Sequence, residues 1–192
     1  MNKFTGVQSL QDAFKSIADT ILINDVPQQA YITTAHLGEK SRRHLHSIEP
    51  FNQGDYVDFR EGVYMVVEDV INQRGAKYKS TIEHCNYKIT LEGESERVIT
   101  GYDDRGRPIY GYITKPGREI HAIVDMDRVT ISGAQIRINT SMMSMLVPDT
   151  EENRTEIIIG KEYDVYGSNM AVSHINRLRT GLLEINLQVK VV

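Results

Sequence analysis

Two histidines, His44 and His46, have the spacing best suited to metal chemistry in this sequence. On a β-strand, residues two positions apart lie on the same face, and two imidazoles there could bind a transition metal. A complete site needs further ligands, and no cysteine or acidic residue is spaced to supply them. Asp125 and Asp127 form a pair too short and isolated to indicate a cation site. We therefore predict no metal site and no cofactor.

Carboxylates could serve acid–base catalysis, and Glu92 with Glu94 is the clearest pair. An exposed pair, however, lacks the burial that adjusts a carboxyl pKa for catalysis. The sequence also contains no G-x-S-x-G nucleophile motif, P-loop, H-E-x-x-H or G-x-G-x-x-G pattern. We expect that the protein is not an enzyme.

Cys85 is the single cysteine of the 192 residues. It excludes an internal disulfide, suits a reducing compartment, and is expected to be a buried, inert thiol within a strand. The net charge of −4 argues against a general affinity for nucleic acid, because such binding requires Lys and Arg to neutralise phosphates. The N-terminus lacks a signal-peptide pattern, and no apolar run approaches the ~18 residues of a membrane span. These features predict a soluble protein, made in the cytoplasm, with no membrane partner.

The segment from Gly54 to Leu91 is the clearest structural pattern and predicts a β-meander. Val, Ile, Tyr and Thr fill its strands, whereas Gly, Asn and charged residues fill the breaks at 60–62 and 72–75. Its last strand is expected to run without interruption from Lys77 to Leu91. The predicted fold is mainly β, with small barrel-like or sandwich-like lobes.

One helix is predicted, near the N-terminus. Leu10, Phe14, Ile17 and Ile21 follow one another at spacings of four, three and four residues, which is the periodicity of an amphipathic helix. We expect a helix over residues 9–20, the longest of the chain. So short a helix needs a surface to pack on, either the core of its own lobe or a neighbouring subunit.

A basic segment precedes the meander and contains Lys40, Arg42 and Arg43. Two interpretations remain open. It could be a solvated polar loop, or it could contact an acidic partner or a nucleic acid.

A second candidate contact region lies between residues 96 and 118. Tyr102 and Tyr110 flank Asp103–Pro108, a stretch with good turn chemistry that includes Arg105 and Arg107. The segment has Tyr and Arg but few aliphatic residues, so it is expected to project as a long hairpin without a core of its own. Such projections usually contact something outside the domain; the alternative is a solvated insertion with no partner.

The last third returns to strand patterns. A methionine cluster at 142–145 could fill the core or provide a flexible contact surface, and residues 148–156 predict an acidic loop. Gly160–Val165 resembles Gly54–Phe59, and each stretch is followed by a short turn and an apolar strand. We therefore predict an N-terminal helical segment (1–25), a β-lobe (26–95), a projecting hairpin (96–118) and a second β-rich half (119–192).

Three phrases of the sequence resemble a pattern found in neck proteins of tailed phages and prophages of Gram-positive bacteria. They are Ser47–Phe51, Gly54–Phe59 with Tyr64–Glu68, and His84–Ile89. The pattern of the family is "G-D-x-V-x-x-x-G-x-x-W/Y-x-V" followed by "K/H-C-N-Y-x-L/I". Its closing phrase is echoed at 162–172 and 180–189. Tyr64 and Met170 stand at the two positions where the family usually has Trp.

The resemblance implies a head-to-tail connector, either a head-closure (stopper) or an adaptor protein, in the virion neck. Such a protein would form a homo-oligomeric ring, on the order of 6 or 12 copies, bind portal, adaptor and tail proteins, and contact translocating DNA only passively. Its expected contact residues are Lys40, Arg42, Arg43, Tyr102, Arg105, Arg107 and Tyr110. The alternatives are a tail-completion or distal-tail protein, and a cytoplasmic β-barrel binding module unrelated to a virion.

Overall fold

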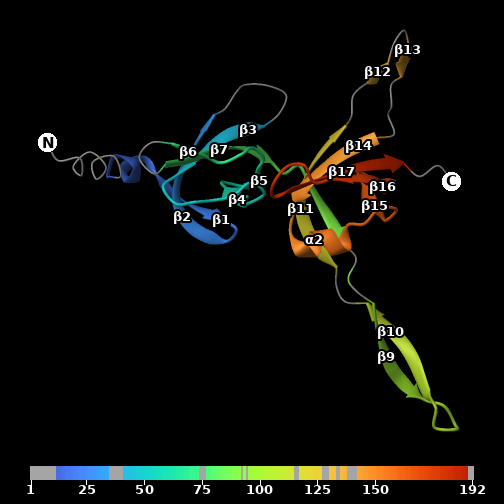
Figure 1. Ribbon diagram of the computed structural model, residues 1–192. Helices are drawn as coiled ribbons and strands as arrows, with labels where there is room; N and C mark the ends of the chain where they lie inside the picture. The colour runs from blue at the N-terminus through green and yellow to red at the C-terminus, as the bar shows by residue number, and fades with distance from the viewer. Residues whose placement is uncertain are drawn as a thin grey trace.

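Strands make up most of the chain in the computed structural model, which confirms the prediction of a mainly β fold (Figure 1). They form two barrel-like bodies, and a long hairpin projects from the second. The structure describes residues 12–34, 41–73, 77–91, 93, 95–114, 117–126, 130–132, 135–137 and 142–189.

The N-terminal barrel contains the first seven strands. Their sheet order is β3-β2-β1-β4-β5-β7-β6, and an additional pairing of β3 with β7 closes the sheet on itself. Ile21, Ala30, Leu45, Val57 and Ile82 are among the apolar residues that fill it. The strands are β1 (Asp19–Ile23), β2 (Val26–Thr34), β3 (Arg42–Ser47), β4 (Tyr56–Phe59), β5 (Gly62–Val66), β6 (Ile71–Gln73) and β7 (Lys77–His84).

The C-terminal barrel is a six-stranded sheet in the order β15-β16-β17-β14-β11-β8. Ile89, Ala122, Met145, Tyr163 and Ile185 belong to its core. Met143 and Met145 are buried, so these methionines fill the core. The strands are β8 (Tyr87–Leu91), β11 (Arg118–Met126), β14 (Met142–Pro148), β15 (Glu162–Val165), β16 (Ser168–Asn176) and β17 (Leu182–Val189).

The two barrels share one topology. The strands β1, β2, β3, β4, β5 and β7 correspond in chain order and in pairing to β8, β11, β14, β15, β16 and β17. The repeat extends to backbone detail at Gly54 and Gly160. Gly54 N–H donates to Val66 C=O at 2.9 Å, and Gly160 N–H donates to Val172 C=O at 2.8 Å. The similarity of the two glycine-led phrases in the sequence therefore reflects a repeated fold.

The barrels differ at one seam. In the N-terminal barrel β1 pairs with β4, through Leu22↔Asp58 and Ile23↔Val57. The corresponding strands β8 and β15 are not paired; Tyr87 Oη instead donates to Asp164 C=O across the gap at 2.9 Å. The C-terminal barrel is thus open where the N-terminal one is closed.

Two hairpins are inserted between strands of the C-terminal barrel. The hairpin of β9 (Ser95–Tyr102) and β10 (Pro108–Thr114) stands between β8 and β11, where the N-terminal barrel has only the turn Asn24-Asp25. A shorter hairpin, β12 (Thr130–Ser132) with β13 (Gln135–Arg137), stands between β11 and β14. The insertions lengthen connections without altering the barrel.

Three local predictions are wrong. Residues 77–91 form two strands in different sheets, because the chain passes from one barrel to the other at Cys85-Asn86, so Cys85 is not within a strand. Ile21 belongs to β1, and the described helical residues of the N-terminal segment are 12–17. The predicted acidic loop contains the helix α2 (Glu151–Glu156), because the Thr150 side chain accepts a hydrogen bond from Asn153 N–H as an N-cap.

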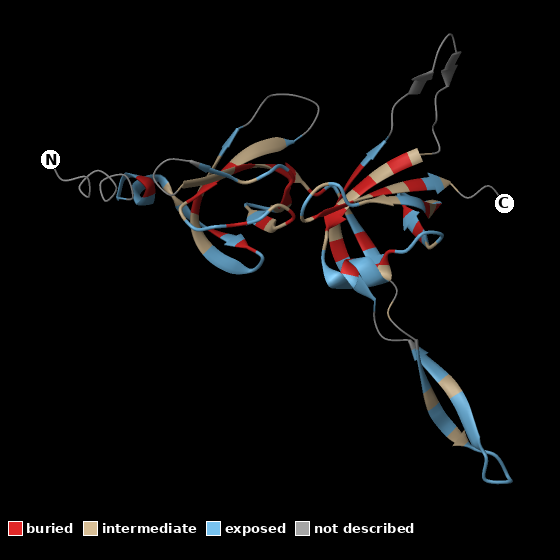
Figure 2. Ribbon diagram, viewed as in Figure 1, coloured by how far each residue is buried: buried red, intermediate tan, exposed pale blue. Residues whose placement is uncertain are grey.

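A third apolar cluster joins the barrels. Met65, Val67 and Cys85 pack with Ile123 and Leu182 of the C-terminal barrel, and buried segments of both barrels meet there (Figure 2). The change of sheet at residues 85–86 comes earlier than the expected end of the first lobe at residue 95. No helix among the described residues is long and apolar enough to span a membrane.

Candidate interaction surface

The tip of the β9–β10 hairpin is held in one shape by Asp103. Its side-chain oxygen Oδ1 accepts hydrogen bonds from the backbone N–H groups of Arg105 (2.9 Å) and Arg107 (2.7 Å). Gly106 has φ of +72°, which glycine adopts at no steric cost. The tip backbone is therefore ordered, and the Arg105 and Arg107 side chains are exposed; neither has a hydrogen-bond or ion-pair partner within the described part of the chain.

The two faces of the hairpin are apolar. Directly opposed residues in an antiparallel pair share a face, so the register places Tyr102, Ile99, Tyr110 and Tyr112 on one face and Val98, Ile109 and Ile113 on the other. Tyr112 is 74% exposed and Tyr102 66% exposed. No other described element covers these apolar side chains (Figure 2).

The charges of the hairpin balance. Residues 95–114 contain three arginines and three carboxylates. Arg97 lies over the Tyr110 ring at 3.6 Å, an arrangement that stabilises an exposed pair by about 0.5–1 kcal/mol. This surface is therefore aromatic, aliphatic and neutral rather than basic.

Gly117 lies close to the barrel where the chain returns from the hairpin. A Cβ at this position would collide with the Leu91 carbonyl oxygen, so the returning chain passes closer to β8 than any other residue would allow. Arg118 then pairs with Leu91 as β11 begins. The close approach at residue 117 therefore requires glycine.

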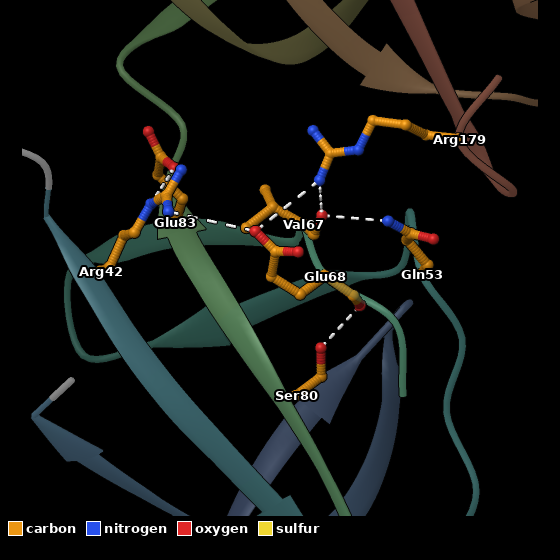
Figure 3. Close-up of polar contacts among 7 residues, drawn as sticks. All are labelled: Arg42, Gln53, Val67, Glu68, Ser80, Glu83 and Arg179. Carbon is orange, nitrogen blue, oxygen red and sulfur yellow. Dashed lines mark hydrogen bonds and ion pairs between the residues drawn. The ribbon is translucent and has the colours of Figure 1, made fainter. Parts of the chain in front are cut away.

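Two arginines of the basic segment contact residues of their own barrel. Arg42 Nε donates to Glu83 Oε2 at 2.8 Å, and Arg42 NH1 lies 4.0 Å from Glu68 Oε1 (Figure 3). The Arg43 guanidinium lies over the rings of Phe59 and Tyr64, at 5.6 and 5.7 Å from their centroids. Both arginines are therefore engaged within the barrel, while Lys40 lies outside the described residues.

Sequence reasoning missed the polar contacts that accompany Arg42 at the junction of the barrels. Arg179 extends from the C-terminal barrel, donates to Val67 C=O, and lies 3.9 Å from Glu68 Oε1. Gln53 Nε2 donates to the same Val67 carbonyl at 3.0 Å. These partners are distant in sequence and carry no motif, so no local signal identified them.

The Asn86 side chain also joins the two barrels, because it forms two hydrogen bonds with the backbone of Val124. Its Nδ2 donates to Val124 C=O and its Oδ1 accepts from Val124 N–H, both at 2.7 Å. Tyr56 Oη also donates to His121 C=O across the junction. The Asn86 side chain thus takes the place of a neighbouring strand residue and holds the segment between the barrels against β11.

His44 and His46 pack in the N-terminal barrel and form no metal site with other described residues. His46 is stacked on Tyr31, with ring centroids 4.4 Å apart. Burial, and then the positive charges of Lys77 and Lys79, lower the pKa of His46 to about 4. The imidazole is therefore neutral near pH 7.

The N-terminal helical residues contact their own barrel. Phe14 is buried against Tyr31, with ring centroids 5.1 Å apart, and Lys77 Nζ lies over both rings. Ile17 is 61% exposed. The described helical residues therefore contact their own barrel through Phe14 and leave Ile17 exposed.

Charged side chains of the described residues line a pocket at the junction of the barrels. This pocket has a volume of about 110 Å³, and its lining includes Arg42, Glu83, Arg179 and Glu184. The first three make the contacts described above, and Glu184 Oε2 accepts a hydrogen bond from Asn176 Nδ2 at 3.4 Å. Burial raises the pKa of the Cys85 thiol to about 12, so the thiol is not a nucleophile at neutral pH. The feature best suited to interaction is the hairpin.

The sequence matches two protein-family models. Residues 2–84 match the YomX N-terminal domain and residues 85–188 match the YomX C-terminal domain. The boundary between the two domains coincides with the passage of the chain from one barrel to the other. No match was found among curated proteins, and none was found among solved structures.

The chain therefore belongs to the YomX family. YomX is a gene product of SPBc2-like Bacillus phages and prophages, so the match supports a phage-associated protein.

Proposed function

We propose that this YomX-family protein is a structural protein of the phage neck, where it assembles into a ring that connects the head to the tail. The observation that carries the proposal is the β9–β10 hairpin, an arm whose exposed apolar side chains no other described element covers, in a phage-associated protein. A two-stranded hairpin is marginally stable alone, so such an arm gains most by packing on another protein. The protein acts by binding and not by catalysis.

The composition of the arm favours a protein partner over DNA. Tyr102, Tyr110, Tyr112 and the tip arginines are residue types enriched at protein interfaces. Balanced charge gives little attraction for phosphates. The arm therefore packs on an adjacent ring or on a tail protein, with Arg105 and Arg107 pairing with acidic residues of that partner.

The contacts between the two barrels support the role of a rigid connector. The apolar cluster around Met65 and Leu182, the Asn86–Val124 pair and the Arg179 contacts hold the two barrels at fixed positions. A connector that must keep a DNA channel in register needs this rigidity, and the unpaired β8–β15 seam offers strand edges to neighbouring subunits.

The test uses a phage or prophage that carries this gene. Gene deletion is expected to yield DNA-filled heads without attached tails in electron micrographs. Complementation with the intact gene restores joined particles, whereas a gene lacking Asp103–Pro108 does not. A matched control replaces Asp25, at the corresponding turn of the N-terminal barrel, with Asn and is expected to complement fully.

Immunogold labelling then locates the protein. Label at the head–tail junction agrees with the proposal. Label at the tail tip favours the distal-tail alternative, and normal particles in the deletion strain, with no label on virions, overturn a virion role.

A further inference from the structure

The repeated barrel contains the same backbone corner twice. In the N-terminal barrel, Asp55 N–H donates to Asn52 C=O at 3.3 Å; in the C-terminal barrel, Lys161 N–H donates to Ile158 C=O at 3.2 Å. Gly54 and Gly160 close the two corners with φ of +92° and +86°. The sequences 52–54 and 158–160 therefore have matching conformations at equivalent places.

The first corner is covered. Gly54 is buried and lies so close to the turn at Gly181 of the C-terminal barrel that a Cβ on Gly54 would collide with the Gly181 carbonyl oxygen. Gln53 of the same corner hydrogen-bonds to Val67, which packs with Leu182 in the junction. This corner is thus part of the interface between the two barrels.

The second corner is bare. Ile158 is 54% exposed, Ile159 is 65% exposed, and nothing lies within 4 Å of a Cβ built on Gly160. Asn52 and Gln53, the equivalents of these isoleucines, are polar. The corner that has no partner within the described chain is therefore the more apolar of the two.

We propose that the Ile158–Gly160 corner is the contact by which one copy of this protein binds the N-terminal barrel of the next. The chain's own barrel–barrel interface provides the template, because the equivalent corner already docks on a barrel of this fold. In every copy the Gly181 turn is already covered by Gly54 of the same chain. The surface that binds the Ile158–Gly160 corner of another copy therefore belongs to the N-terminal barrel.

The resulting assembly is head-to-tail. One surface of a copy binds a different surface of the next, and such a heterologous contact closes into a ring when the rotation per subunit allows it. The inference gives the proposed ring its subunit contact and rests on that proposal for its biological setting. The self-association itself requires only the purified chain.

Sedimentation velocity over a concentration series tests the contact. The sedimentation coefficient of the unmodified protein is expected to rise with concentration, and Ile159→Asp is expected to weaken association by about tenfold or more. Leu178→Asp is the matched control, because Leu178 is 89% exposed and lies outside the corner; it should associate like the unmodified protein. If Ile159→Asp lowers the unfolding midpoint, Ile159→Gln replaces it as the milder variant.

Photocrosslinking identifies the surface of the second copy that binds the Ile158–Gly160 corner. A benzophenone amino acid at position 159 is expected to join two copies, with the crosslinked peptides of the second copy falling within residues 1–84. A protein that stays monomeric up to its solubility limit, an Ile159→Asp variant that associates normally, or crosslinks to the C-terminal barrel would each overturn the inference. A neck location can fail while this contact stands, because these measurements contain no phage components.

Discussion

The two barrels follow the same strand order and yet differ in what they leave open. The N-terminal barrel is closed by the β1–β4 pairing, and its Gly54 corner is covered by the second barrel. The C-terminal barrel has an unpaired seam, two inserted hairpins and a bare Gly160 corner. The core of the fold is thus repeated, whereas the hairpin insertions and the exposed corner occur in the C-terminal half.

The largest expected difference is in the free energy of unfolding after substitution of the equivalent glycines Gly54 and Gly160. Gly160→Ala should cost about 1–2 kcal/mol, the penalty for a left-handed backbone with a Cβ. Gly54→Ala carries the same penalty and also drives a methyl group into the Gly181 backbone, so we expect a loss of about 3 kcal/mol or more. Equilibrium urea unfolding measures both; equal losses would mean that the Gly54 corner is not packed against the second barrel.

Acid should destabilise the protein through the N-terminal barrel. His46 has a folded pKa of about 4, below its ordinary value of 6.5, because burial and the nearby lysines disfavour the charged ring. The unfolded chain therefore binds a proton first as the pH falls, and stability is lost between about pH 6.5 and 4, by at most about 3 kcal/mol.

Urea unfolding at intervals from pH 7 to 4 measures this loss. His46→Phe keeps a ring against Tyr31 but removes the titrating group, so its curve should be flatter. A residual slope remains, because burial also lowers the pKa of His44 and His121. The same slope in both proteins would show that His46 does not cause the acid sensitivity. Strand β14, the counterpart of the His46 strand, contains no histidine.

Cys85 allows a smaller test at the place where the barrels meet. Cys85→Ala removes buried volume from the junction cluster and should cost about 1–2 kcal/mol. The raised thiol pKa predicts slow labelling by a thiol reagent in the folded protein and fast labelling in urea. Fast labelling of the folded protein would indicate that the barrels separate readily.

The smallest thermodynamic effect is expected at the hairpin tip. Replacing Asp103–Pro108 with a two-residue Asn-Gly turn removes no core residue, so the free energy of unfolding should change by less than about 0.5 kcal/mol. Calorimetry measures the change. A clear drop in the unfolding temperature would mean that the arm packs on its own chain.

Local patterns were sufficient to predict the elements whose causes are local. The hairpin follows from the turn chemistry of Asp103 and Gly106, and the repeated glycine-led phrases of the sequence correspond to the repeated barrel. The helix α2 was missed because its acidic residues favour solvent, although Thr150 is a good N-cap.

Features set by distant contacts could not be predicted. Residues 77–91 contain no glycine or proline, so no strong turn signal marks the place where the chain changes barrels. The hydrogen bond from Arg42 to Glu83, 41 residues away in the chain, has no local signal in the sequence. Of the predicted contact residues, the structure brings together Tyr102, Arg105, Arg107 and Tyr110 on one arm and places Arg42 and Arg43 elsewhere.

The contiguity of each barrel in the sequence has a consequence for synthesis. All the strands that close the first barrel lie before residue 85, so that barrel can fold on the ribosome while its Met65 and Val67 surface is still bare. The covering residues Gly181 and Leu182 are translated nearly a hundred residues later, a delay of roughly 5–20 seconds at bacterial elongation rates. During that interval the nascent chain exposes an apolar end that molecular chaperones would recognise.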